Sequence, residues 1–159
     1  MKTPSRRVEL GVVCAVIVLD RLTKLWALKW LFFRSPLRVL PFFHLTYVEN
    51  TGAAFGLMQG ANAFFIGVSI TLLCGLLWLR RKIEPALWGA RVATALVAGG
   101  ALGNLYDRLV HGHVIDFLDF RVWPVFNVAD SCISIGAVLL AFLIGRDPER
   151  ESLAGGERG

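Results

Sequence analysis

Four long apolar runs constrain the fold of this chain more than any other feature of its sequence. The run at 62–79 has no charged residue and is long enough to cross a membrane as a helix. The chain is 55% hydrophobic and only 18% charged, whereas soluble domains are about 25% charged. We therefore predict a mainly α-helical membrane protein with four transmembrane helices, at about 9–28, 62–79, 88–105 and 125–145.

The basic residues indicate how these helices are oriented. They gather at 2–7, at 80–82 together with Arg91, and at 146–150. Four spans put all three groups on the side of both termini, which the positive-inside rule assigns to the cytoplasm. The loops 29–61 and 106–126 then face outward. The net charge of +5 is thus interpreted as a topology signal, and we expect no nucleic-acid partner.

The outward loop 29–61 has the composition of strands and turns. Val39–Val48 is rich in aromatic and β-branched residues, which favour strands. The stretch NTGAAFGL at 50–57 is typical of a turn where backbone comes close to another group. We predict one domain at 1–145 with a β-rich outer segment at about 34–58. The polar tail at 146–159 is expected to be disordered.

Two acids lie where the chain enters the fourth span. Asp130 is the only ionisable group of the run 125–145, about five residues from its start. An acid in a membrane span is costly and is usually functional. Asp116 precedes it by a short loop in which Pro124 turns the chain, so we expect the two carboxylates to approach each other at the outer face.

A close pair of carboxylates suits the hydrolysis of a peptide. Both cannot ionise freely, so one proton is held between them. The ionised member can take a proton from water, and the protonated member can polarise a carbonyl and then protonate the leaving amine. This chemistry needs no metal and no other cofactor. The pair would titrate as a unit, and the residues do not say which acid is the base.

Other interpretations stay open at this point. Asp119 replaces Asp116 if the loop is helical, while Asp20 with Lys24, and Asp107 with Arg108, could be simple interfacial ion pairs. His111 and His113 lack an evident third metal ligand, and neither H-E-x-x-H nor G-x-S-x-G occurs. A proton- or ion-coupled carrier that uses Asp107, Asp116 and Asp130 as relay sites, or a non-catalytic lipid-binding or assembly factor, would also fit.

Five motifs in order give the chain a specific resemblance. They are D-x-x-T-K at 20–24, NTGAAF at 50–55, GNLYDR at 103–108, HVIDF at 113–117 and FNVAD at 126–130. At these residues, and over about 8–145, the chain resembles the lipoprotein signal peptidases, also called signal peptidase II. Arg21 stands where glutamine is frequent in that family, and the stretch between Asp116 and Asn127 is short.

The resemblance implies an aspartic endopeptidase of the bacterial inner membrane. It would remove the signal peptide of diacylglyceryl-modified prolipoproteins, just before the lipid-bearing cysteine. The resemblance further implies a four-helix fold with a small extracytoplasmic β-cradle at 34–58, and a short helix or flap within 109–126 over the site. Its catalytic pair falls on Asp116 and Asp130. Supporting or substrate-binding roles fall on Asp20, Lys24, Asn50, Gly52, Asn104, Asp107, Arg108, Asn127 and Ala129.

The resemblance also implies the partners. These are the prolipoprotein, membrane lipid and inhibitors like the cyclic peptide globomycin, and we expect a monomer. Gly99 and Gly103 form a G-x-x-x-G, which lets helices approach closely. We also expect the Gly- and Ala-lined spans to admit the helix or acyl chains of the substrate.

Overall fold

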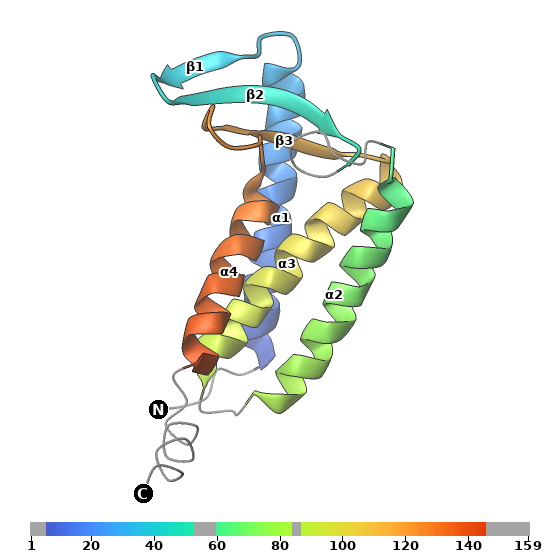
Figure 1. Ribbon diagram of the computed structural model, residues 1–159, viewed down its shortest axis with the longest axis vertical. Coiled ribbons are helices and arrows are strands. Elements are labelled where there is room, and N and C mark those ends of the chain that lie inside the picture. Colours follow the sequence, from blue (N-terminus) through green and yellow to red (C-terminus); the bar gives the residue numbers. More distant parts are fainter. Residues whose placement is uncertain (1–5, 53–59, 84–86, 146–159) are drawn as a thin grey trace, which may run out of the picture.

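Four helices carry a small antiparallel sheet at one end (Figure 1). The computed structural model describes residues 6–52, 60–83 and 87–145. Parts of the outer segment (53–59) and the polar tail (146–159), for which we made predictions, lie outside these residues. In chain order the elements are α1 (Arg6–Leu31), β1 (Leu37–Leu40), β2 (Phe43–Asn50), α2 (Asn62–Lys82), α3 (Trp88–Val110), β3 (Val114–Asp119) and α4 (Val128–Gly145).

The helix α3 is the centre of the helical layer, and small residues let its neighbours approach. A Cβ atom added at Gly99 would lie 2.9 Å from Cβ of Val16 on α1. One added at Gly103 would lie 2.8 Å from Oδ2 of Asp20. The prediction of close helix packing is therefore confirmed. At these two glycines the space is filled by α1 of the same chain, so neither of them offers the opening for the substrate that we expected of the Gly- and Ala-lined spans.

The helix α1 has the reverse of the pattern of a soluble helix. Its buried stripe repeats every three to seven residues and holds Glu9, Val16, Asp20, Lys24, Ala27 and Leu31. Its other faces expose large apolar side chains such as Leu19, Leu22 and Leu25. Between its ends, where Arg6, Arg7 and Lys29 are exposed, α1 thus turns Asp20 and Lys24 inside and apolar groups outside, as does a helix surrounded by lipid.

Among the described helices, only α2 meets a strict test of length and apolar composition for a membrane span. The apolar helix at Val128–Ile144 is shorter than that test requires. The helices α1 and α3 carry Asp20, Lys24 and Asp107, which are buried against one another. The helices α1, α2 and α3 extend slightly beyond the predicted spans, whereas α4 begins only at Val128. Asp130 consequently lies in the first turn of α4 and not five residues into a span.

The sheet has the order β1-β2-β3 and joins two distant parts of the chain. Val48 of β2 pairs with Asp116 of β3, and Asn50 pairs with Val114. The predicted β-rich segment supplies β1 and β2. The expected short helix or flap within 109–126 is instead the strand β3 and a loop, because Gly112, at φ 78°, lies just past the end of α3 and the segment that follows pairs with β2.

The two faces of β3 serve different purposes. Ile115 and Phe117 are buried against Ala27 and Leu31 near the end of α1, where they form a hydrophobic core. Since successive side chains of a strand alternate between faces, Asp116 points to the opposite side. The core therefore fixes the direction in which this carboxylate is presented.

Candidate active site

Asp116 is held by two side-chain amides. Nδ2 of Asn127 donates to its Oδ1 over 2.7 Å, and Nδ2 of Asn50 donates to its Oδ2 over 2.9 Å. Asn50 lies two residues from the register partner of Asp116, so both side chains are on one face of the sheet. The backbone N–H of Gly52 donates to Oδ1 of Asn50 over 2.9 Å, which orients the amide. Of the site residues predicted here, Asn50 therefore bonds Asp116 directly, and Gly52 acts on it through Asn50.

Asp130 is held by the same kind of groups. Nδ2 of Asn104 on α3 donates to its Oδ1 over 2.7 Å, and the backbone N–H of Asn127 donates to its Oδ2 over 3.3 Å. In return, Oδ1 of Asn127 accepts the backbone N–H of Asp130 over 2.9 Å. The fully buried Asn127 is thus bonded to both acids. The structure brings Asp116 and Asp130 to one site, as the sequence predicted.

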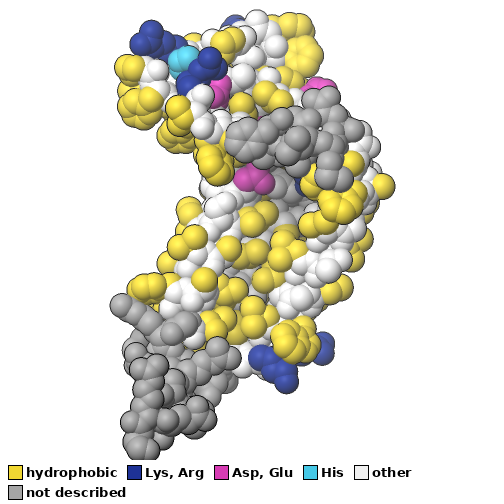
Figure 2. All heavy atoms as spheres, viewed as in Figure 1, with side chains coloured by type: hydrophobic (Ala, Val, Ile, Leu, Met, Phe, Trp, Pro, Cys, Tyr) yellow, Lys and Arg dark blue, Asp and Glu magenta, His cyan; other side chains and the backbone are white. Residues whose placement is uncertain are grey.

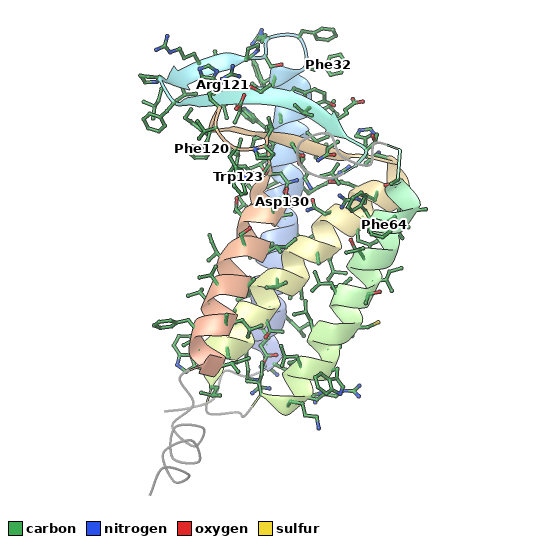
Figure 3. All side chains as sticks on the ribbon, in the orientation of Figure 1. Phe32, Phe64, Phe120, Arg121, Trp123 and Asp130 are labelled. Atoms are coloured by element: carbon green, nitrogen blue, oxygen red, sulfur yellow. The ribbon has the colours of Figure 1, made fainter. Side chains whose placement is uncertain are left out.

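The two acids line one cavity of about 300 Å³. Figure 3 shows Asp130 at the end of α4 beneath the sheet, with Trp123 beside it. The rest of the wall combines side-chain amides, one cation and apolar groups, most of which come from the β3–α4 loop. The other lining residues are Asn50, Gly52, Phe65, Asn104, Arg108, Val114, Pro124, Val125 and Phe126. A cavity of this kind can hold a short peptide segment next to the two carboxylates.

The carboxyl of Asp116 has a raised pKa. Burial raises it most, the nearby charge of Asp130 adds to this, and together they bring the pKa of Asp116 to about 7. The hydrogen bonds from Asn50 and Asn127 act in the opposite direction. Two neighbouring carboxyls with one raised pKa can share a single proton near neutral pH. This is the protonation state that acid–base hydrolysis requires.

Beneath the pair lies a buried group of charges centred on Lys24. Its Nζ lies 2.7 Å from Oδ2 of Asp20 and 2.6 Å from Oδ2 of Asp107. The same ammonium donates to Oδ1 of Asn104 over 2.8 Å, and Arg21 bonds Oδ1 of Asp107 over 2.8 Å. Asp20 with Lys24 is therefore not a surface ion pair. Through Lys24 these four charged residues support Asn104, whose amide holds Asp130.

The start of α4 is fixed by backbone contacts. The N–H of Ala129 donates to Oδ1 of Asp20 over 2.9 Å, and a Cβ added at Gly100 would meet the carbonyl oxygen of Ala129. Ala129 is fully buried, so a larger side chain could not fit there. These residues determine where the next residue, Asp130, lies.

The structure places Asp107, Arg108 and Asp119 apart from the aspartate pair or from the partners considered for them. Asp107 and Arg108 do not pair with each other: Asp107 bonds α1, while the guanidinium of Arg108 lies 5.3 Å from the ring centroid of Phe65. Arg108, for which a supporting or substrate-binding role was predicted, lies in the cavity wall. Asp119 is bonded by Thr46 and Arg121 on the other face of the sheet, so it is not the partner of Asp130.

Within the described ranges no group of three His, Cys, Asp or Glu side chains could hold a metal ion. His111 and His113 lie side by side, with ring centroids 6.2 Å apart, at the outer end of α3. They do not line the cavity.

The sequence alone did not identify several residues of the site. Trp123, Phe65 and Val114 line the cavity, but apolar residues are common throughout the chain and gave no signal. Arg21 contacts Asp107 across 86 positions of sequence. The one sign of this residue in the sequence was that arginine stands at position 21, where glutamine is frequent in the family.

Comparison with known proteins decides the family. The family model described as "Signal peptidase (SPase) II" matches residues 12–145. The chain belongs to the signal peptidase II family. The lipoprotein signal peptidase of Desulfitobacterium hafniense is 43% identical over 91% of this chain and 95% of its own length. That of Pelotomaculum thermopropionicum is 42% identical over 89% and 93%.

Solved structures agree with this membership. One, described as a bacterial membrane enzyme at 2.3 Å resolution, has a TM-score of 0.84 at 30% identity and covers 94% of each chain. A second such structure, at 1.9 Å resolution, has a TM-score of 0.80 at 31% identity. This signal peptidase II homologue is therefore a peptidase with the fold of known bacterial membrane enzymes. The resemblance that the five motifs indicated is confirmed.

Proposed function

We propose that this protein is an intramembrane aspartic endopeptidase that removes the signal peptide of diacylglyceryl-modified prolipoproteins before the lipid-bearing cysteine. Its family membership supports the peptidase activity, and its relatives are named lipoprotein signal peptidases. One observation carries the aspartic mechanism: Asp116 and Asp130 are both bonded to Asn127 and both line one cavity.

In the proposed mechanism the pair holds one proton. The ionised carboxylate takes a proton from a water molecule, whose oxygen attacks the carbonyl carbon of the scissile peptide. The protonated carboxyl donates its proton to the carbonyl oxygen. The tetrahedral intermediate then collapses: one of its hydroxyls returns a proton to the ionised member of the pair, the other member protonates the leaving amine, and the C–N bond breaks, so that the pair again holds one proton. Asn50, Asn104 and Asn127 keep the carboxylates oriented through this sequence.

All four helices are proposed to cross the bacterial cytoplasmic membrane, with both termini in the cytoplasm and the sheet outside. The exposed apolar faces of α1 and α2 support this arrangement, because the charges of α1 are turned inward. The cations Arg80, Arg81 and Lys82 lie at the end of α2 away from the sheet. The acid pair is then at the depth where the chain leaves the membrane on the outer side.

An apolar groove offers the substrate a path from lipid. It is a shallow, open depression along α2 alone, lined by Ala63, Phe64, Gly67, Val68, Thr71 and Leu72. Figure 2 shows apolar side chains along the helices on both sides of a hollow, with an acidic group near its upper end. We propose that the acyl chains or signal helix of the prolipoprotein enter along this hollow. Membrane lipid occupies it otherwise.

The test is cleavage of a defined prolipoprotein by the purified protein in lipid bicelles. We expect cleavage of the diacylglyceryl form only, with mass spectrometry placing the new N-terminus at the modified cysteine. A chelator should leave the rate unchanged, globomycin should inhibit, and the active species should be a monomer. Cleavage that a chelator abolishes would contradict the mechanism. Ion or proton flux in proteoliposomes without cleavage would favour the carrier, and lipopeptide binding without cleavage would favour an assembly factor.

A further inference from the structure

A continuous series of polar contacts leads from the outer surface to Asp130. Nη2 of Arg21 donates to Nε2 of His111 over 3.1 Å, and Nη1 bonds Oδ1 of Asp107 over 2.8 Å. The other oxygen of Asp107 meets Lys24, which bonds Asn104. Asn104 in turn holds Asp130. Arg21 is the member of this series that lies between the exposed histidine and the buried charges.

Three groups fix the guanidinium of Arg21. Besides Asp107 and His111, the ring of Tyr106 lies under it with its centroid 5.0 Å from Cζ. A guanidinium has only donors, so Nε2 of His111 must be unprotonated to accept this bond. Such a planar, three-sided arrangement is specific to arginine, because an ammonium cannot reproduce the fork or the stacking. The position is only partly exposed, with 31% of the side chain accessible.

The charges of the buried group balance only if Arg21 is counted. Asp20 and Asp107 supply two negative charges, and Lys24 and Arg21 supply two positive ones. Without Arg21 the group would carry a net negative charge directly beneath the aspartate pair. Burial raises the pKa of Asp116, and the positive charge of Lys24 in this group opposes that rise. A change of charge in this group must therefore change the pKa of the aspartate pair.

We propose that Arg21, held by His111 and Tyr106, is a positioning residue that neutralises the charge group beneath Asp116 and Asp130 and thereby sets the pH range of the enzyme. This inference rests on the proposed aspartic mechanism. The other charged groups facing the pair are Lys24 and Arg108, and those facing Arg21 are Asp107 and His111.

The experiment is the pH profile of kcat/KM for Arg21→Gln, Arg21→Lys and the wild type. We expect the alkaline limb of Arg21→Gln to move to higher pH by roughly 0.3 to 1 unit, since a net negative charge favours the protonated pair. Arg21→Lys should return the limb close to that of the wild type. Arg34→Gln, at an exposed arginine of the same outer side, serves as the control and should not move it.

Charge compensation separates this role from a merely structural one. Asp107→Asn leaves the group with a net positive charge and should move the limb to lower pH. The double variant Arg21→Gln with Asp107→Asn restores the balance and should restore the limb. If Arg21→Gln does not fold, Asp107→Asn still tests the proposal. A limb that stays in place in every folded variant, with the rate reduced equally at all pH values, would overturn it.

A further control separates this inference from the proposed function. Asp116→Asn is assayed in parallel. Its activity at wild-type level would refute the aspartate pair itself, whatever the Arg21 variants do. If Asp116→Asn is inactive and the limb of Arg21→Gln does not move, only the role of Arg21 is refuted.

Discussion

Asn127 donates its side-chain amide to Oδ1 of Asp116 over 2.7 Å, and this bond ties strand β3 to the residue before α4. The oxygen of the same amide accepts the backbone N–H of Asp130 over 2.9 Å. The donor and acceptor ends are thereby fixed, since a reversed amide could make neither bond. One residue with no charge of its own determines how the two acids face each other.

Asn127→Ala should therefore reduce kcat by about 100-fold or more, because small misplacements of reacting groups have effects of this size. Loss of the bond to the N–H of Asp130 should also lower the free energy of unfolding by about 1 kcal/mol. Steady-state kinetics and thermal unfolding in detergent measure the two effects. A variant with kcat within threefold of the wild type would show that the amide does not orient the pair.

The raised pKa of Asp116 predicts how stability depends on pH. The folded protein holds a proton on this carboxyl up to pH of about 7, whereas an unfolded aspartate releases it near 3.9. Between these values the folded state binds more protons, so the stability contributed by this group decreases as pH rises. We expect the Tm of the wild type to fall across this window more than that of Asp116→Asn. Equal slopes for both proteins would show that the pKa of Asp116 is not raised.

Lys24→Met should destabilise the protein strongly. The side chain is fully buried, and its removal leaves the carboxylates of Asp20 and Asp107 without their shared cation. Uncompensated buried charges of this kind cost about 3–5 kcal/mol. Lys29→Met is the matched control, because Lys29 lies on the same helix and is exposed. Thermal unfolding of the two variants should differ by many degrees, and equal Tm values would contradict the buried charge group.

Gly100→Ala tests the contact of α3 with α4. Alanine is favoured over glycine in a helix by about 1 kcal/mol, but here its Cβ would meet the carbonyl of Ala129 and lie 2.9 Å from Cγ1 of Ile133. We expect a lower Tm and reduced activity. Gly75→Ala, which meets no atom within 4 Å, should leave both unchanged or raise the Tm. A stable, fully active Gly100→Ala protein would contradict this packing.

The sequence predicted the helices and the acid pair because these depend on local patterns. Apolar runs determine the helices, and the cost of an acid next to lipid singles out Asp130. The third strand was not predicted, since its six residues, VIDFLD, do not alternate between apolar and polar side chains and so lack the usual strand pattern. The pairing of Asp116 with Val48 depends on strand register, which no local pattern near Asp116 specifies.

The contacts of Arg21 could not be predicted from the sequence either. The same holds for the different roles of Asp107 and Arg108. Each depends on the side of α1 or α3 that faces the bundle, and on partners more than 40 positions away. In contrast, Asp20 and Lys24 could be paired from their spacing of four residues. What spacing could not reveal is that this pair is completely buried.

The most direct test of the account compares cleavage by Asp116→Asn and Asp130→Asn with that by the wild type, all verified as folded. Asp119→Asn is the control, since Asp119 is a buried acid on the same strand but is bonded to Thr46 and Arg121. Both pair variants should lose activity by about 1,000-fold or more, while Asp119→Asn should cleave at a rate close to that of the wild type. Substantial cleavage by either pair variant would contradict a mechanism in which Asp116 and Asp130 together activate water.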